Sequence, residues 1–457
     1  MASVKDIYGE VTIDDGALWG ANTQRSIENF PVGIEKMPVD LIKALLELKR
    51  ACAVANKKQQ KLAPEKADAI IASIDSLLAE DFYRHFPLAI WQTGSGTQTN
   101  MNANEVIANH ANQAVGEKLI HPNDDVNMGQ SSNDVFPTAM HIMATTMLAN
   151  GLIPELRNIE NTLLKMESQY MEVLKTGRTH LQDATPITFG QEVSGWRMMF
   201  TEGIQQTEDT LKYLRKLAMG ATAVGTGLNT YSGFDQDVTD ALNARLHLDF
   251  TPSENKFHAI STKDSFVFSH GAINTIATNT LKMVNDIRLL ASGPRVGLGE
   301  INLPANEAGS SIMPGKVNPT QAESLAMVCV QVMANNQSIS IGSSLGNFQL
   351  NAYMPLIANA FWQSVRLLSD GMNSFDTRCL RGITLNKDKM RYNLTTSLMT
   401  ATYLNQKFGY DQTALIVKEA HDRGISIKEV VVGLGLMSSE DFDLFFDYEA
   451  MVKPEKQ

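Results

Sequence analysis

Residues 309–319, which read GSSIMPGKVNP, combine side chains that could act on a small anion. Two adjacent hydroxyls, Ser310 and Ser311, come before a Pro-Gly pair, and Lys316 and Asn318 come after it. Proline presets its own φ and glycine accepts a positive φ, so this pair is typical of a turn. The segment is therefore predicted to be a hinged loop that carries two hydroxyls, one cation and one amide.

A helix is predicted to begin where this loop ends. Asn318 suits the N-cap, Pro319 suits the first helical position, and Gln321 stands where a capping box has a glutamine. Because a helix N-terminus attracts anions, the loop could hold a phosphate or a carboxylate.

The nucleotide-binding pattern GxxxxGK[ST] does not fit this loop. Five residues, not four, separate Gly309 from Gly315, and Val317 stands where the pattern has its magnesium-binding Ser or Thr. Taken alone, the loop could also be a solvated surface turn. The other polar segments of the chain decide between these alternatives.

A second polar segment, WQTGSGTQTNMN at residues 91–102, has Ser95, Gly96 and Thr97 near its centre. A stretch rich in Gly and Ser can be a flexible linker. Apolar residues flank this one on both sides, however, as they would flank a hydrogen-bonding loop attached to a core. We therefore favour the attached loop.

Two further polar turns follow closely. Residues 121–125 read HPNDD and residues 131–134 read SSND, so both are rich in side-chain donors and acceptors. Ser, Asn and Asp are also the usual residues at helix N-caps. For Asp125 and Asp134 we predict this capping role.

A histidine lies between two long predicted helices. The segment TGRTHLQDATP places His180 beside Arg178 and Thr179, and Pro186 is predicted to open the next helix. A lone histidine in a loop is usually an ordinary hydrogen-bonding residue. A Ser-His-Asp hydrolase using Ser310 and His180 is conceivable, but the nucleophile pattern GxSxG is missing. No ligand spacing of a metal site appears, so no metal is predicted.

These segments must be positioned by helices, because apolar residues recur at helical spacing over most of the chain. Five stretches carry long apolar seams, the first with a period of 3.5 residues, and such helices favour a bundle. The stretches are residues 152–173, 189–214, 273–290, 325–332 and 357–375. Shorter helices are predicted over residues 39–62 and 64–80. No alternating run of convincing length predicts a strand.

The predicted fold class is therefore all-α. The predicted domains are a mainly helical mixed domain over residues 1–130, a central bundle over 131–387 and a small helical domain over 388–457. Some helices are apolar on more than one face, as at residues 198–200. A monomer would expose such surface, so an oligomer is expected.

Composition limits the classes of partner. The 457 residues are 43% apolar and 19% charged, which is typical of a soluble enzyme, and the net charge of -11 argues against nucleic acid and anionic membrane surfaces. Cys52, Cys329 and Cys379 are widely spaced, as expected for buried thiols in a reducing compartment. No secretory signal, transit peptide or run of about 18 apolar residues is visible. A cytoplasmic location is therefore expected.

Together, these motifs resemble the fumarase/aspartase superfamily, and within it the class II fumarate hydratases. The resemblance covers almost the whole chain, through LWGANTQRS, WQTGSGTQTNMN, HPNDDVN, SSNDVFPTAMH, GRTHLQDATP, GTGLNT and GSSIMPGKVNP. Aspartases are very similar, but they carry glutamine at the position of His180 and alanine at that of Gly315. Both positions here look like those of a fumarase.

The resemblance implies an all-helical fold of three domains, whose long central helices form a twenty-helix core in a homotetramer. Each active site would then take loops from three subunits. The implied reaction is the reversible hydration of fumarate to L-malate by acid/base elimination chemistry through a carboxylate-stabilised carbanion. It implies neither a metal nor an organic cofactor.

The resemblance also implies residue roles. Ser310 would remove the C3 proton of malate, and His180, oriented by Glu323, would handle water. The residues implied to bind the substrate carboxylates are Ser95, Gly96, Thr97, Ser131, Ser132, Asn133, Thr179, Ser311, Lys316, Val317 and Asn318.

A second dicarboxylate site of the family matches residues His121, Pro122, Asn123 and Asp124. Related enzymes often have an arginine three residues before that histidine, whereas this chain has Lys118. Lysine keeps the charge but loses the bidentate fork of the guanidinium.

Two other functions remain open at this point. One is an ammonia lyase of the same superfamily that acts on aspartate. The other is a helical scaffold or regulatory protein that keeps the fold without activity, which agrees poorly with an intact Ser310, Lys316 and His180.

Overall fold

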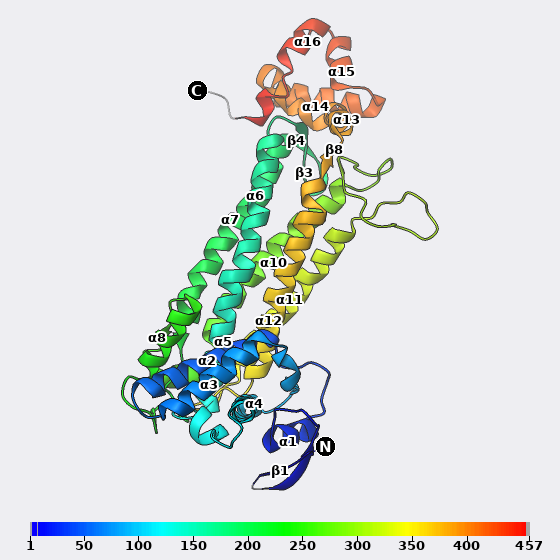
Figure 1. The fold of residues 1–457 in the computed structure, drawn as a ribbon. Helices are drawn as coiled ribbons and strands as arrows, with labels where there is room; N and C mark the ends of the chain where they lie inside the picture. Colours follow the sequence, from blue (N-terminus) through cyan, green and yellow to red (C-terminus); the bar gives the residue numbers. More distant parts are fainter. Residues whose placement is uncertain (1, 7, 454–457) are drawn as a thin grey trace. The chain divides into compact units, whose positions relative to one another are not determined.

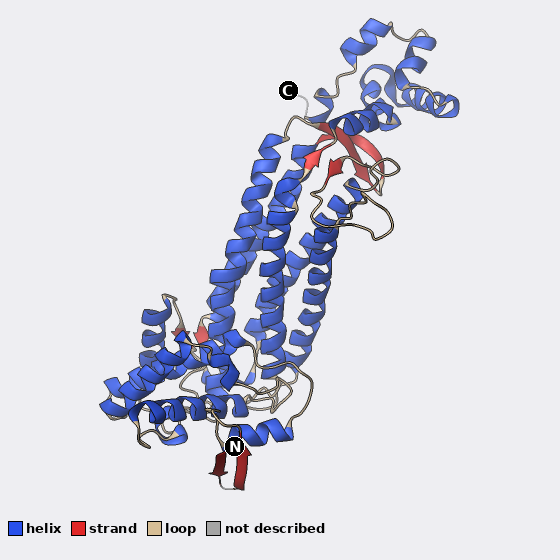
Figure 2. Ribbon diagram, turned by 45° about the vertical axis from the view of Figure 1, so that its right-hand side comes forward, coloured by secondary structure: helices blue, strands red, loops and turns tan. Residues whose placement is uncertain are grey.

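The computed structural model describes residues 2–6 and 8–453, and their regular structure is mainly helical. This confirms the predicted all-α class. The strands in this part of the chain are two to seven residues long, and each pairs with a single other strand (Figure 2). Most are too short to show the alternation from which a strand is predicted, and the two longest, LKTGRT and QDATPIT, have no regular alternation of apolar and polar residues.

The chain divides into two compact units that are each discontinuous in sequence. Unit 1 comprises Met1–Pro154, Gly203–Thr278 and Val328–Asp370, and unit 2 comprises Glu155–Glu202, Asn279–Met327 and Gly371–Gln457. Several long helices contribute residues to both units. The division into three domains at residues 130 and 387 stays a prediction.

Unit 1 contains the N-terminal elements and two short helices from the middle of the chain. In α2 (Val39–Lys58) the residues Leu41, Ile42 and Leu45 are fully buried, which is the apolar face that their spacing predicted. The other elements are β1 (Ala2–Asp6), β2 (Gly9–Ile13), α1 (Ala21–Asn29), α3 (Pro64–Ala79), α4 (Thr97–Val115), α5 (Ser132–Met147), β5 (Lys216–Leu217), α8 (Phe234–Leu246), β6 (Thr251–Pro252) and α9 (Lys256–Ser261).

Within each unit, segments of the long helices run side by side (Figure 1). Their bounds confirm the five apolar seams: α6 (Ile153–Gln169), α7 (Phe189–Leu214), α10 (Asp264–Leu290), α11 (Thr320–Ser344) and α12 (Met354–Arg378). In unit 2 the Trp196 indole of α7 donates to Asp286 of α10 at 3.1 Å. In unit 1 the buried His270 of α10 contacts Ser364 of α12 at 2.8 Å.

Unit 2 ends in a group of small helices with their own apolar core, which includes Leu404, Ile416 and Val430. Its remaining elements are β3 (Leu174–Thr179), β4 (Gln182–Thr188), β7 (Ile301–Asn302), β8 (Thr384–Leu385), α13 (Lys387–Thr396), α14 (Asn405–Arg423), α15 (Ile427–Gly433) and α16 (Ser439–Phe445).

The predicted loop around His180 is instead a β-hairpin made of β3 and β4. Pro186 lies in β4 opposite Thr176, and α7 begins only at Phe189, so the prediction that Pro186 opens the helix was wrong. A two-stranded hairpin has two free edges, and an edge tolerates a residue that lacks an N–H donor.

The three cysteines are buried and form no disulfide, as predicted. Burial raises the pKa of each thiol, Cys52, Cys329 and Cys379, to about 12. They are therefore inert thiols at neutral pH.

Candidate active site

In unit 1 the serine and threonine side chains of two distant segments form one row of hydroxyls. The oxygens of Ser95 and Thr97 lie 2.9 Å apart, and Thr97 Oγ1 lies 2.9 Å from Ser132 Oγ. All three side chains are partly buried. Each hydroxyl both donates and accepts, so the row can turn its donors toward a carboxylate.

Glycine at position 96 is required by both conformation and space. Gly96 has a φ of 72°, and a Cβ atom there would lie 2.2 Å from the Phe136 ring. Gln92 fixes the same loop, because its side-chain oxygen accepts from the backbone N–H of Thr99 at 3.2 Å and from its hydroxyl at 2.9 Å. The segment is thus an attached loop and not a flexible linker.

The hydroxyls lie at two helix N-termini, since α4 begins at Thr97 and α5 begins at Ser132. Ser131 is the N-cap of α5 and forms a capping box with Asp134, which confirms the capping role predicted for that aspartate. The Asn133 side chain donates to the Ala223 carbonyl at 2.8 Å. Free N–H groups at helix N-termini favour anions, so this part of unit 1 suits a carboxylate.

A buried cation beneath these turns was missed by sequence reasoning. Lys49 of α2 is fully buried, and its ammonium donates to Asn127 and Gln130 at 2.8 Å each. Burial lowers its pKa to about 7, while Asp134, also fully buried, has its pKa raised by burial to about 6. The sequence does show a lysine within the apolar seam of residues 41–52. By periodicity alone, such a lysine counts as a break in the seam and not as a buried charge.

In unit 2 the loop of residues 309–319 positions Ser310 with backbone groups. Ser310 Oγ accepts the N–H of Ile312 at 3.2 Å and that of Met313 at 3.1 Å. Hydrogen bonds donated to an oxygen stabilise its anionic form. The loop therefore supplies local dipoles of the kind that a serine needs to act as a base.

The two ends of this loop lie against each other. The Asn318 side chain donates to the Gly309 carbonyl at 2.5 Å, and a Cβ atom on Gly309 would lie 2.1 Å from the Lys316 carbonyl oxygen. The predicted N-cap position of Asn318 was wrong, because α11 begins at Thr320 and Pro319 therefore precedes its first residue. Within this helix, Gln321 accepts from the Ser374 hydroxyl at 2.9 Å.

A cavity of about 750 Å³ lies beside the loop in unit 2. Lys316, Val317 and Asn318 line it together with Arg288, a cation near the end of α10 that sequence reasoning missed. One guanidinium nitrogen of Arg288 lies 4.0 Å from Glu323, and both side chains are partly exposed. The cavity thus has two cations on its wall, and the role of Glu323 toward His180 stays a prediction.

Thr179 and His180 are exposed at the tip of the β3–β4 hairpin. Thr179 pairs with Gln182, so His180 and Leu181 form a two-residue turn with φ values of 57° and 60°. Left-handed backbone costs about 1–2 kcal/mol for each residue other than glycine. The surrounding structure must therefore hold this turn.

The predicted second site is a compact turn in unit 1. His121 Nδ1 accepts the backbone N–H of Asp124 at 3.1 Å, and the Asp124 carboxylate lies at the same distance. Asp125 accepts the His121 N–H at 2.8 Å and pairs with Lys66 at 2.9 Å, so it has the structural role predicted for it. The exposed Asp124 carboxylate opposes binding of a second anion, and occupancy of this site stays a prediction.

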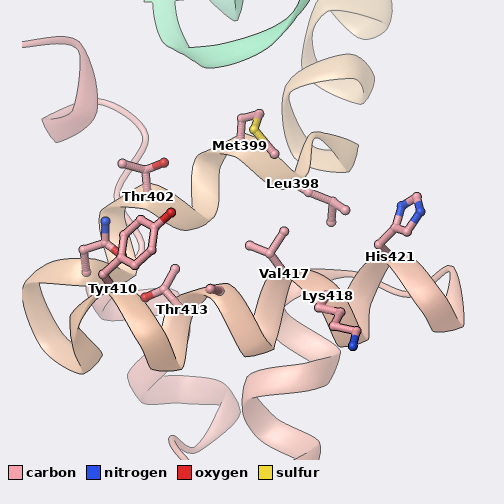
Figure 3. Close-up of a pocket in the computed structure, with 10 residues that line it drawn as sticks. Leu398, Met399, Thr402, Tyr410, Thr413, Val417, Lys418 and His421 are labelled. Carbon is pink, nitrogen blue, oxygen red and sulfur yellow. The ribbon is translucent and has the colours of Figure 1, made fainter.

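Another cavity, of about 470 Å³, lies among the C-terminal helices (Figure 3). Leu398, Met399 and Val417 give it an apolar wall, with Lys418 and His421 at one side. None of the predicted site residues lines it. Among the residues that the structure describes, its lining has no carboxylate to pair with Lys418 or His421, and we place no chemistry there.

Within the described residues, no group of three or more His, Cys, Asp and Glu side chains is placed to hold a metal ion. Nor does any helix in this part of the chain have the length and apolar character to span a membrane.

Comparison with known proteins gives consistent matches over the full chain. A family model described as lyase matches residues 9–334, and one described as fumarase C C-terminus matches residues 401–453. The class II fumarate hydratase of Helicobacter pylori is 53% identical over 454 residues, and that of Photorhabdus laumondii is 49% identical; each match covers 98% of both chains. A crystal structure of class II fumarase from Schistosoma mansoni matches with a TM-score of 0.96 at 39% identity, covering 100% of both chains.

Proposed function

The chain belongs to the class II fumarate hydratase family, which hydrates fumarate reversibly to L-malate, and we propose that the polar loops described above carry out this reaction. The chain is thus a hydro-lyase. Ser310 supports the assignment of the loops most directly, because its oxygen accepts two backbone N–H groups and so is prepared to carry negative charge.

In the elimination direction, the ionised oxygen of Ser310 takes the C3 proton of malate and becomes a neutral hydroxyl. The electron pair of that C–H bond moves into the neighbouring carboxylate, which becomes an aci-form with additional negative charge. The C2–oxygen bond then breaks, and His180 gives the departing hydroxide a proton, so fumarate and water form. Glu323 orients His180.

The developing charge on the carboxylate needs fixed donors, and each such donor contributes roughly 10² to 10³ in rate. We assign this role to the hydroxyls, amides and cation of the predicted set: Ser95, Gly96, Thr97, Ser131, Ser132, Asn133, Thr179, Ser311, Lys316, Val317 and Asn318. The hydroxyl row, the two helix N-termini and the cations beside the 309–319 loop support this assignment. Every step is assigned to a side chain of the protein, so the proposed reaction requires no metal or organic cofactor.

The proposal includes a homotetramer in which each site takes residues from more than one copy of the chain. One face of α11 supports an oligomer, since Met327, Val330 and Ile341 are all more than half exposed on it. Exposed apolar side chains repeated along one helix are typical of an interface. We further propose that the enzyme works in the cytoplasm as part of the tricarboxylic acid cycle.

Substrate choice within the superfamily is tested by a simple assay. L-malate is expected to give fumarate, which absorbs near 240 nm, while L-aspartate is expected to give none. His180, at a position where aspartases carry glutamine, is the reason for this expectation. Fumarate formed from aspartate and not from malate would make the chain an ammonia lyase, and no turnover of either substrate would favour the inactive scaffold.

A further inference from the structure

The turn that presents His180 has a conformation that its own residues do not favour. His180 and Leu181 both have left-handed backbone, although neither is glycine. The side chain of Leu181 is 74% exposed, so packing of this residue in unit 2 does not hold the turn. The constraint must therefore come from the strands of the hairpin.

A single buried carboxylate joins that hairpin to two other segments of unit 2. Glu300 is fully buried, and its Oε1 accepts from Arg178 of β3 at 2.5 Å and from Asn393 of α13 at 3.0 Å. Its Oε2 lies 3.2 Å from the ammonium of Lys175, which is also in β3. Glu300 comes directly before β7 and the segment that leads to Ser310.

Three carboxylates act on the two cations of this cluster, because the exposed Asp183 lies opposite Arg178 in the hairpin and adds to Glu300 and Glu192. Lys175 is 1% exposed and also pairs with Glu192 at 2.7 Å. Burial opposes ionisation of Glu300, but the hydrogen bond from Arg178 and the charge of Lys175 outweigh it and hold its pKa below the usual range. Removing the Glu300 charge would leave Arg178, two residues from His180, without its ion-pair partner and would make the cluster more positive by one charge.

We propose that Glu300 is a positioning residue for the hydration reaction, which fixes the hairpin of His180 and sets the charge felt by that imidazole. Glu300 does not touch the substrate in this account and acts through Arg178 and Lys175. The inference rests on the proposed role of His180 as the group that handles water.

The Glu300→Gln variant tests this role, because glutamine keeps the shape and an acceptor but loses the charge. We expect kcat to fall at least about tenfold, since a small misplacement of a catalytic group is costly. We also expect the limb of the pH–rate profile that belongs to His180 to move down by about half a pH unit, because the more positive cluster disfavours the imidazolium. Titration of kcat and kcat/KM against pH measures both effects.

Two further variants separate charge from structure. The Glu300→Gln/Lys175→Met double variant restores the wild-type net charge of the cluster, so its His180 limb is expected at the wild-type pH while kcat stays low. Asp376→Asn is the matched control: Asp376 is also buried in unit 2, but its ion pair at 2.5 Å is with Arg381 and not with the hairpin. The His180 limb of the pH–rate profile of this control variant is expected at the wild-type pH.

A fall in kcat without a shift of the limb would make Glu300 merely structural and would overturn the inference, as would a shift without a fall. If Glu300→Gln does not fold, the double variant decides the matter, and a kcat at the wild-type level would overturn the inference. Failure of the proposed function looks different. In that case the His180→Asn variant would keep the limb of the pH–rate profile that we assign to His180, whatever the result for the Glu300→Gln variant.

Discussion

Replacing His180 with asparagine is expected to lower kcat for malate and for fumarate by at least about two orders of magnitude, as for a positioned acid/base group. Asparagine fills similar space and keeps hydrogen-bonding groups, but it does not titrate. The left-handed backbone at this position tolerates asparagine better than most residues, so the hairpin should persist. Steady-state kinetics in both directions measure the effect.

The matched control is His258→Asn. His258 is an exposed histidine near the end of α9 that lies 3.4 Å from Asp264 and has no part in the proposed site. Its replacement is expected to leave kcat unchanged. Near-normal turnover of the His180→Asn variant would remove this histidine from the mechanism.

Replacing Ser310 with alanine is expected to lower kcat by roughly 10² to 10⁴, because the proton acceptor at C3 is lost. The backbone N–H groups of Ile312 and Met313, which donate to Ser310 Oγ, would remain in place but would have no oxygen to stabilise. Exchange of the C3 proton of malate with solvent should be lost with the overall reaction. Proton NMR of malate in D₂O follows this exchange.

Ser311→Ala is the informative comparison, since it removes the neighbouring hydroxyl from the same loop. Ser311 is assigned to substrate binding, so its loss should raise KM more than it lowers kcat. Equal effects of the two replacements on kcat would contradict the separate role of Ser310.

The helices of this protein were largely predictable because each long one has an apolar stripe. The seam that begins at Phe189 and ends at Leu214 has the same bounds as α7. The hairpin of His180 was not predictable in the same way. Its turn has left-handed residues that are not glycine, and its strands do not alternate apolar and polar residues, so neither turn chemistry nor alternation marks it.

The candidate site shows a similar division. The polar loops could be found from composition, and the family resemblance gave the roles of their residues. The geometry within a loop could not be predicted, because it depends on contacts between residues far apart in the sequence, such as Thr97 with Ser132. Arg288 and Glu300 were missed for the same reason, since nothing in their own sequence neighbourhood shows that they face Glu323 and Arg178.

The central claim is a proposal about the homotetramer: the hydroxyl row and the His180 hairpin of one active site come from different copies of the chain. Mixed oligomers test it most directly. The Thr97→Val/Ser132→Ala variant and the His180→Asn variant would be purified separately, dissociated and reassembled in equal amounts. If the two parts come from different copies, about one quarter of the sites in the mixture carry both intact parts.

The account therefore predicts that the reassembled mixture regains about one quarter of wild-type turnover, although each variant alone has almost none. A mixture no more active than the separate variants would contradict it, because the hydroxyl row and the histidine would then have to come from the same copy.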